Sequence, residues 1–171
     1  TPVAGIGPDG DSYQPKEGRQ VETGFKYTPS GFDGYMTLAV FDVKEDKTLI
    51  STGAPVQEQA GERHSQGVEV EGVGYLTDNL KLTASYTYTD ARYDVSDDQK
   101  DERAPLIPYH MASTWLDYSF DGALSGLALG GGVRYVGESK PSPGSTIERD
   151  VPSYTLYDVM VRYDFDKHWT A

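Results

Sequence analysis

Glu69 and Glu71 are the residues whose type and spacing come closest to those of a catalytic pair. Residues two apart in an extended strand lie on one face, roughly 7 Å from each other, and two carboxylates at such a separation can serve acid–base hydrolysis. The competing interpretation is a polar wall, with Lys81 or Arg134 on other strands as ion-pair partners. We favour the polar wall, because the sequence offers neither a G-x-S-x-G motif nor a Ser–His–acid order typical of a triad. We therefore predict that the chain is not an enzyme.

A metal, phosphate or thiol site is not expected either. The three histidines, His64, His110 and His168, are scattered and form no H-x-x-x-H pair. The three consecutive glycines at 130–132 are followed by no helical pattern, so they indicate a bend or a close backbone approach in a strand rather than a phosphate-binding loop. The sequence contains no cysteine, which excludes disulfide, iron–sulfur and thiolate chemistry within it. We predict no cofactor and no metal site.

Several arginines and aromatic residues lie in the long connections between the predicted strands, where such groups can hold a polar chelate by stacking and charge-assisted hydrogen bonds. They are Arg63, His64, Arg92, Tyr93, Arg103, Tyr109 and Arg149. For each of them, ordinary solvated loop surface is the alternative. We predict Arg103 and Tyr109 as the ligand-binding residues, because they lie beside the start of a strand.

The elements that must position these residues are strands, and residues 68–92 show this most clearly. Val68 and Val70 alternate with Glu69 and Glu71. After a short turn at 77–79, the even-numbered positions are apolar and the odd-numbered positions are polar. The apolar set is Leu80, Leu82, Ala84, Tyr86 and Tyr88, and the polar set is Lys81, Thr83, Ser85, Thr87 and Thr89. Since side chains on a strand point alternately to opposite faces, the pattern predicts one apolar and one polar wall.

A similar alternation predicts strands at about 20–28, 34–44, 109–120, 126–137 and 154–165, with the start of a further strand at 168–171. In 34–44 both faces are fairly apolar. There Asp42 and Lys44 favour placing the odd-numbered residues on the apolar wall: Tyr35, Thr37, Ala39, Phe41 and Val43. The predicted strands are roughly 10 residues or longer, whereas about 5–6 is the commonest length in globular proteins and about 9–11 tilted residues cross a bilayer.

The connections between these strands alternate between short and long. The long ones, 45–64, 93–108 and 138–153, are polar. Ordinary domains rarely contain several structureless loops of more than about 12–15 residues, whereas outer-membrane barrels have short turns on one side and longer loops on the other. We therefore predict an all-β fold, an antiparallel up-and-down meander of about seven to eight long strands that forms part of a transmembrane outer-membrane β-barrel.

The overall composition narrows the function classes further. The net charge of −12 argues against a nucleic-acid partner, because phosphate binding requires a basic surface. The sequence has no run of about 18 apolar residues, the length that a transmembrane helix requires. The mean hydropathy of −0.56 keeps a soluble β-sandwich binding module as an alternative, although only every second residue of a barrel strand meets lipid.

Three segments resemble the C-terminal barrel strands of TonB-dependent siderophore receptors, most closely those of the ferrichrome and hydroxamate type. The segments are YQPKEGRQVETGFKYTPSGFDGYMTLAVFDVKEDKTLIS, SQGVEVEGVGYLTDNLKLTASYTYTDARY and GGGVRYVGES…VPSYTLYDVMVRYDF. The resemblance covers nearly the whole chain. It implies a protein of the bacterial outer membrane that binds and imports a ferric siderophore without covalent chemistry, using energy supplied by a TonB complex.

The resemblance also implies that residues 1–171 are one part of such a receptor barrel, without the N-terminal plug that contacts TonB and without the final strands. Outer-membrane lipid is then the partner expected at the apolar wall. A meander by itself has two unpaired edges, and open edges recruit further strands. We therefore expect the isolated chain to self-associate edge to edge, or to form a curved open sheet, rather than a monomeric closed barrel. Another nutrient, such as cobalamin or a carbohydrate, is the alternative cargo within this family.

Overall fold

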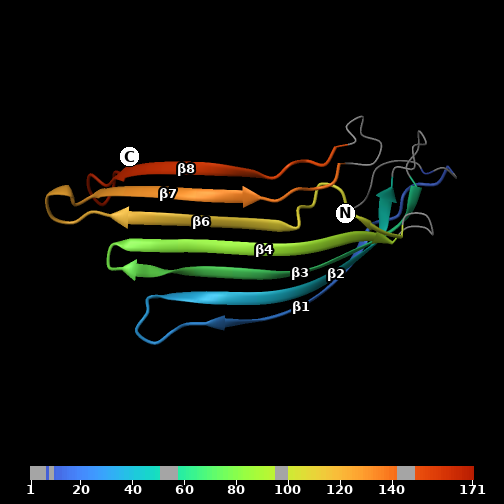
Figure 1. Ribbon diagram of the computed structural model, residues 1–171, viewed down its shortest axis with the longest axis horizontal. Coiled ribbons are helices and arrows are strands. Elements are labelled where there is room, and N and C mark those ends of the chain that lie inside the picture. The colour runs from blue at the N-terminus through green and yellow to red at the C-terminus, as the bar shows by residue number, and fades with distance from the viewer. Residues whose placement is uncertain (1–6, 8–9, 51–57, 95–99, 142–148) are drawn as a thin grey trace.

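The computed structural model describes residues 7, 10–50, 58–94, 100–141 and 149–171, and their strands form one curved antiparallel sheet (Figure 1). The strands are β1 (Glu17–Tyr27), β2 (Gly34–Ile50), β3 (Glu58–Thr77), β4 (Leu80–Asp94), β5 (Lys100–Arg103), β6 (His110–Ser119), β7 (Leu127–Val136) and β8 (Tyr154–Tyr163). Their order in the sheet is β1-β2-β3-β4-β6-β7-β8, with the short β5 paired to β4 only. The predicted all-β meander is therefore confirmed.

The predicted alternation between short and long connections holds only in part, because residues 51–57 between β2 and β3 are no more numerous than residues 120–126 between β6 and β7. At one end of the sheet, which we call the turn end, tight turns join β1 to β2, β3 to β4 and β6 to β7 (left in Figure 1). At the opposite end, which we call the loop end, β2, β4 and β7 end and β3, β6 and β8 begin. At the β3–β4 turn, Thr77 Oγ1 accepts hydrogen bonds from the backbone amides of Asn79 and Leu80 at 3.4 and 3.1 Å. Gly31 in the β1–β2 turn has a φ of 77°, a conformation that glycine adopts without steric cost.

The register of the strands gathers the apolar rows onto one continuous face, because residues paired across an antiparallel sheet point to the same side. Along β4, Leu82 pairs with Leu116 of β6, and Tyr86 pairs with Val70 of β3. On β7 and β8, Val133 pairs with Tyr157, and Leu129 with Val161. The apolar face thus runs from Val21, Thr23, Phe25 and Tyr27 of β1 to Thr155, Tyr157, Val159, Val161 and Tyr163 of β8.

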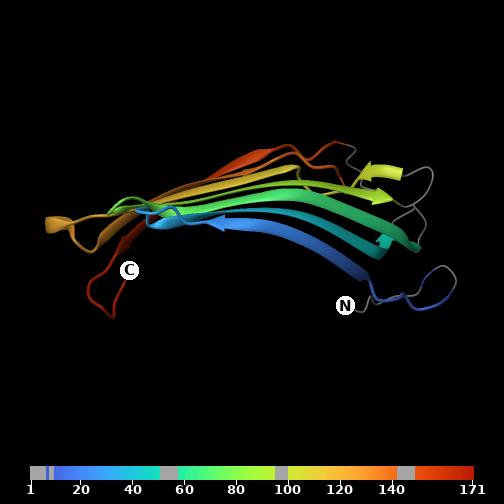
Figure 2. The same cartoon turned by 90° about the horizontal axis from the view of Figure 1, so that it is seen from below.

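No second layer covers this face in the part of the chain that the structure describes (Figure 2). Val159 is 85% exposed and Tyr157 is 77% exposed. Among the described residues, the buried apolar side chains are only Ala91, Ala104 and Ala128. A β-sandwich buries its apolar rows between two packed sheets, so the soluble-sandwich alternative is wrong for these strands. In the same described residues, no helix is long and apolar enough to cross a membrane.

The predicted face of β2 is wrong. The register pairs Phe25 with Leu38 and Thr23 with Val40, which places Met36, Leu38 and Val40 on the apolar face. The odd-numbered residues predicted to lie there, Tyr35, Thr37, Ala39, Phe41 and Val43, are on the polar face. Asp42 misled the prediction because it lies on the apolar side of the sheet, between Val21 and Gln66, where that face becomes polar.

Asp42, Gln66 and Asp90 are neighbours across three strands and mark where the apolar face ends toward the loop end. From Leu80 to Tyr88, β4 remains apolar on this side, which is close to the 9–11 residues that cross a bilayer. The strands β2, β3 and β4 continue past this border and reach 17, 20 and 15 residues. They therefore extend beyond a membrane-spanning length.

The predicted connection at 45–64 is wrong in extent for this reason, since β2 runs to Ile50 and β3 starts at Glu58. Ion pairs support these extensions, where no apolar alternation exists to be recognised in the sequence. Lys16 Nζ lies 2.7 Å from Glu45 Oε1, and Arg63 also pairs with Glu45. Lys47 Nζ lies 2.5 Å from Glu17 Oε1.

Two further sequence predictions need correction. The predicted loop at 93–108 contains the short strand β5, which pairs with β4. The further strand predicted at 168–171 is only a bridge between Asp164 and Thr170, formed where the chain turns back on the end of β8. Backbone hydrogen bonds of 2.9 and 3.0 Å between Tyr163 and Ala171 close this turn.

Candidate functional site

The polar face of the sheet is the first candidate site, because it gathers charged side chains from several strands. Arg134 donates two hydrogen bonds to Asp158, with Nε–Oδ2 and Nη2–Oδ1 distances of 2.9 and 3.1 Å. Arg162 lies 3.8 Å from Asp117 and 3.6 Å from Asp164. This pattern of exposed pairs is typical of a wall that meets water rather than of a catalytic centre.

The two glutamates of the sequence analysis lie on the same polar face. The hydroxyl of Tyr35 donates to Glu71 Oε1 at 3.1 Å, and the Lys26 ammonium lies 3.6 Å from the centroid of the Tyr35 ring. Glu69 pairs across the sheet with Ala39 and Thr87. Neither partner considered from the sequence pairs with them, since Arg134 binds Asp158 and the register places Lys81 across from Tyr75 and Asp117. The glutamates therefore form part of the polar wall.

Gly130 and Gly132 leave room for the Trp115 ring on the polar face of β7. A Cβ on Gly130 would lie 2.5 Å from the Trp115 ring, and one on Gly132 would lie 2.4 Å from it. The indole therefore lies against the backbone of β7, as the prediction of a close backbone approach required. Gly131 points to the other face, where the atom nearest to an added Cβ is the Asp158 carbonyl oxygen at 3.8 Å.

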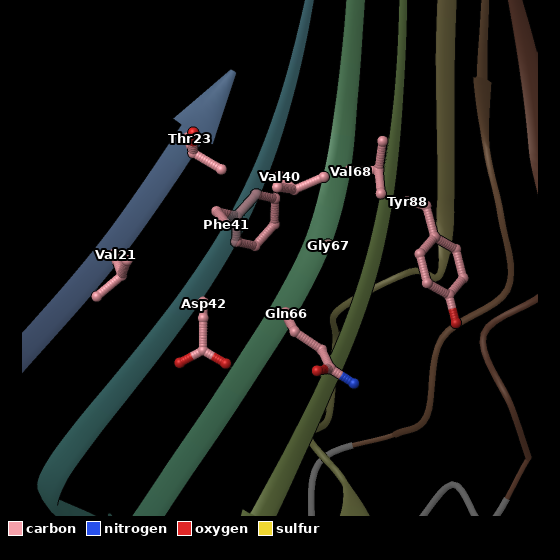
Figure 3. A pocket seen from close by; sticks show the side chains of 9 residues that line it. All are labelled: Val21, Thr23, Val40, Phe41, Asp42, Gln66, Gly67, Val68 and Tyr88. Carbon is pink, nitrogen blue, oxygen red and sulfur yellow. The ribbon is translucent and has the colours of Figure 1, made fainter.

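A shallow hollow of about 400 Å³ lies near the middle of β1 to β4 (Figure 3). It is lined by Val21, Thr23, Val40, Phe41, Asp42, Gln66, Gly67, Val68 and Tyr88. The register places Val40, Val68 and Tyr88 on the apolar face, and Asp42 and Gln66 at its polar border. The hollow carries no group suited to a charged ligand apart from Asp42, so we do not assign a ligand site there.

The predicted ligand-binding residues come together at the loop end. The Arg103 guanidinium lies 3.4 Å from the centroid of the Tyr109 ring. Arg103 Nη2 also donates hydrogen bonds to the carbonyl oxygens of Ile107 at 3.0 Å and Glu138 at 3.1 Å. Their contact is thus part of the structure, and their role as ligand contacts stays a prediction.

Of the other loop candidates, Arg92 lies next to this pair, because it is the register partner of Arg103 across β4 and β5. Arg63 pairs with Glu45, His64 Nε2 lies 2.6 Å from Asp42 Oδ2, and Arg92 Nε lies 3.1 Å from Asp90 Oδ1. Arg149 is exposed. In the described ranges of the chain, no group of three or more His, Cys, Asp or Glu side chains is placed to hold a metal ion.

Glu45 is a residue that sequence reasoning missed, because its partners lie on neighbouring strands. It lies beyond the polar border of the apolar face, between Lys16 and Arg63. Partial burial raises the pKa of Glu45, but hydrogen bonds and Coulombic attraction from Lys16 and Arg63 outweigh the burial, so the pKa lies below its ordinary value of 4.5. This cluster stabilises the extension of the strands toward the loop end.

Known proteins of similar sequence cover nearly the whole chain. The ferrichrome outer membrane transporter/phage receptor of Escherichia coli strain K12 is 39% identical over 166 residues, which are 95% of this chain and 22% of the relative. The ferrioxamine B receptor of Salmonella typhimurium strain SL1344 is 39% identical over 173 residues, or 96% of this chain and 24% of the relative. The chain thus spans less than a quarter of the length of these relatives.

A solved structure supports the same fold. The ferric yersiniabactin uptake receptor of Yersinia pestis matches with a TM-score of 0.75 over 95% of this chain and 24% of that chain. The two sequences are 17% identical, so this match shows the fold alone. The family model described as "TonB dependent receptor-like, beta-barrel" matches residues 2–171. With one apolar and one polar face on a single curved sheet, the chain belongs to the family of TonB-dependent receptor-like β-barrels.

Proposed function

We propose that the complete protein, in which this chain forms part of the barrel wall, binds a ferric siderophore and imports it across the bacterial outer membrane. The observation that carries the proposal is the uncovered apolar face, which continues across all seven meander strands and is backed by a charged polar face. Such a sheet is suited to lipid on one side and water on the other. The cargo follows from relatives named for ferrichrome and ferrioxamine B.

In this proposal, the residues of this chain form part of the barrel wall and part of its outer opening, the mouth, and they carry out no covalent chemistry. The apolar rows contact outer-membrane lipid, and the Arg134–Asp158 and Arg162–Asp117 pairs line the water-filled interior. The loop end faces outward, where Arg103 and Tyr109 belong to the mouth. The remaining strands, the plug and the contact with the TonB complex belong to the rest of the complete receptor.

The test uses the full-length receptor in a bacterial strain that lacks its own hydroxamate receptors. We expect uptake of iron from ferrichrome or ferrioxamine B, and we expect this uptake to stop when TonB is deleted. Cobalamin serves as the control cargo in the same cells. Uptake of cobalamin together with no binding of either ferric hydroxamate would overturn the proposal.

A further inference from the structure

Most of the buried side chains in the described part of this sheet lie at the loop end. Ala104 is 0% exposed, Ala91 is 1% exposed and Ser139 is 7% exposed. These residues come from three places in the chain: β4, the segment before β6 and the segment after β7. We call the set Ala91, Arg103, Ala104, Ile107, Tyr109, Glu138 and Ser139 the rim cluster. Burial at this position is unexpected for the bases of solvated loops.

Backbone hydrogen bonds join the segments of the rim cluster. The Ala104 amide donates to the Ala91 carbonyl at 2.8 Å, which ties the segment before β6 to β4. The Leu106 amide donates to the Lys140 carbonyl at 2.9 Å, which ties the same segment to the chain after β7. Ser139 and Val151 exchange two bonds of 3.1 and 2.8 Å. The bases of the β4–β6 and β7–β8 connections are therefore linked to each other.

Arg103 is the side chain that spans this linkage. One nitrogen, Nη2, donates to the Ile107 carbonyl in the segment before β6 and to the Glu138 carbonyl after β7. The guanidinium carbon also lies over the Tyr109 ring, 3.4 Å from its centroid. In the described part of the chain, Arg103 forms no ion pair. The positive charge of Arg103 faces carbonyl oxygens and the Tyr109 ring. Charge-assisted hydrogen bonds and a cation–π interaction therefore stabilise the position of this side chain.

We propose that Arg103, held over Tyr109, is a positioning residue that fixes the described bases of the β4–β6 and β7–β8 connections to each other at the mouth of the receptor. This inference rests on the proposed function and concerns the mouth that meets a ferric hydroxamate. In this inference, Arg103 acts through the backbone at the bases of both connections, in place of the direct ligand contact that the sequence predicts for it. Because a surface ordered in advance loses less conformational entropy on binding, releasing the two connections weakens capture of the siderophore without changing the later transport step.

The first test needs no ligand. In the full-length receptor, we expect Arg103→Gln to speed hydrogen exchange at the amides of Leu106 and Ser139 by at least about tenfold, because hydrogen bonds to a charged group are lost. Arg134→Gln is the matched control, since it removes an arginine of the polar face and leaves the rim cluster intact. Exchange at these amides that is unchanged by Arg103→Gln would overturn the proposal.

The second test separates positioning from direct contact. Tyr109→Phe keeps the ring under Arg103 and Tyr109→Leu removes it. With ferrichrome and ferrioxamine B as probes, we expect Arg103→Gln and Tyr109→Leu to raise the KM of uptake by about tenfold while the maximal rate stays within about twofold. We expect Tyr109→Phe to behave as the wild type. Equal losses for Tyr109→Phe and Tyr109→Leu would mean that the hydroxyl binds the ligand, which contradicts the proposal.

The two experiments keep this inference apart from the proposed function. Exchange is measured in the absence of siderophore, so it decides the linkage of the two connections whatever the cargo is. If the wild-type receptor takes up neither hydroxamate, the proposed function fails and the exchange result still stands. If the wild type takes up both and Arg103→Gln leaves the KM unchanged, the positioning role fails and the proposed function stands.

Discussion

Trp115 occupies the polar face in a way that depends on two glycines of the neighbouring strand. Its indole lies where the side chains of residues 130 and 132 would otherwise project. A large aromatic ring can thus lie flat on the wall because β7 offers bare backbone beneath it. The same triplet contains its own control, since Gly131 faces the opposite side of the sheet.

We expect Gly132→Ala to destabilise the full-length receptor by about 1–3 kcal/mol, because the added methyl group overlaps the Trp115 ring. Gly131→Ala is expected to be neutral, since its nearest neighbour would be 3.8 Å away. Thermal unfolding in detergent measures both variants. Equal destabilisation by the two substitutions would show that Trp115 does not lie against β7.

The ion pairs of Glu45 make the stability of the strand extensions dependent on pH. Its pKa in the folded protein is lower than the ordinary value of 4.5, so its contribution to stability is complete above that value and is lost as the pH falls through the lowered pKa. We expect Glu45→Gln to reduce the free energy of unfolding by about 1 kcal/mol at neutral pH. The difference from the wild type is expected to vanish in acid.

Thermal unfolding of the full-length receptor in detergent, followed from pH 7 downward, checks this expectation for Glu45. Asp78→Asn at the exposed β3–β4 turn is the control, because no ion pair of Asp78 is seen in the described structure. A Glu45→Gln effect that persists unchanged into acid would rule out the ion-pair account.

At the scale of the strand, most of the sheet could be predicted from the sequence. Apolar and polar residues alternate with a period of two, and this pattern indicates which side chains share the apolar face and which share the polar face. β4 and β8 were predicted closely, since their apolar rows alternate with polar or charged side chains along most of each strand. β2 was assigned to the wrong face because Phe41 lies on the polar face and Asp42 lies on the apolar side, at its polar border. Only the register with β1 and β3 distinguishes these two arrangements.

The corrected face of β2 leads to a direct comparison of two neighbouring positions. We expect Leu38→Lys to destabilise the barrel in a bilayer, by up to about 2–4 kcal/mol near the midplane, because it exposes a charge to lipid. Ala39→Lys lies on the polar face, across from Glu69, and is expected to cost little. Leu38→Ala measures the loss of packing alone. Unfolding of the receptor in lipid vesicles that showed a larger cost for Ala39→Lys would contradict the assignment.

The candidate site could be predicted only in part, for reasons that the strands make clear. Arg103 and Tyr109 are close in sequence, so their proximity was foreseeable. The hydrogen bond from Arg103 to Glu138 joins positions 35 residues apart, and no local pattern encodes it. The bond from Tyr35 to Glu71 was hidden for a different reason, because Tyr35 had been placed on the opposite face.

At the scale of the whole molecule, the sheet curves but does not close. Within the described residues, β1 and β8 each pair with a single neighbouring strand, so each leaves one edge free. Free edges and an uncovered apolar face are both surfaces that associate in water. In the complete receptor, we propose that the remaining strands and the lipid cover them.

We therefore expect the isolated 171-residue chain to self-associate in the absence of detergent. Light scattering of the refolded chain, with and without detergent, checks this. A monodisperse monomer in plain buffer would contradict both the open edges and the lipid-facing assignment of the apolar rows.

The most direct test of the account places a spin label at each position from 80 to 88 of β4, in a full-length receptor otherwise free of cysteine and reconstituted in a bilayer. The chain itself contains no cysteine that would interfere. We predict that labels at Leu82, Ala84 and Tyr86 are reached by dissolved oxygen from the lipid, while labels at Lys81, Thr83 and Ser85 are reached by a water-soluble relaxation agent. Equal access along the strand, or the reverse alternation, would contradict the claim that the apolar face of this sheet contacts the membrane.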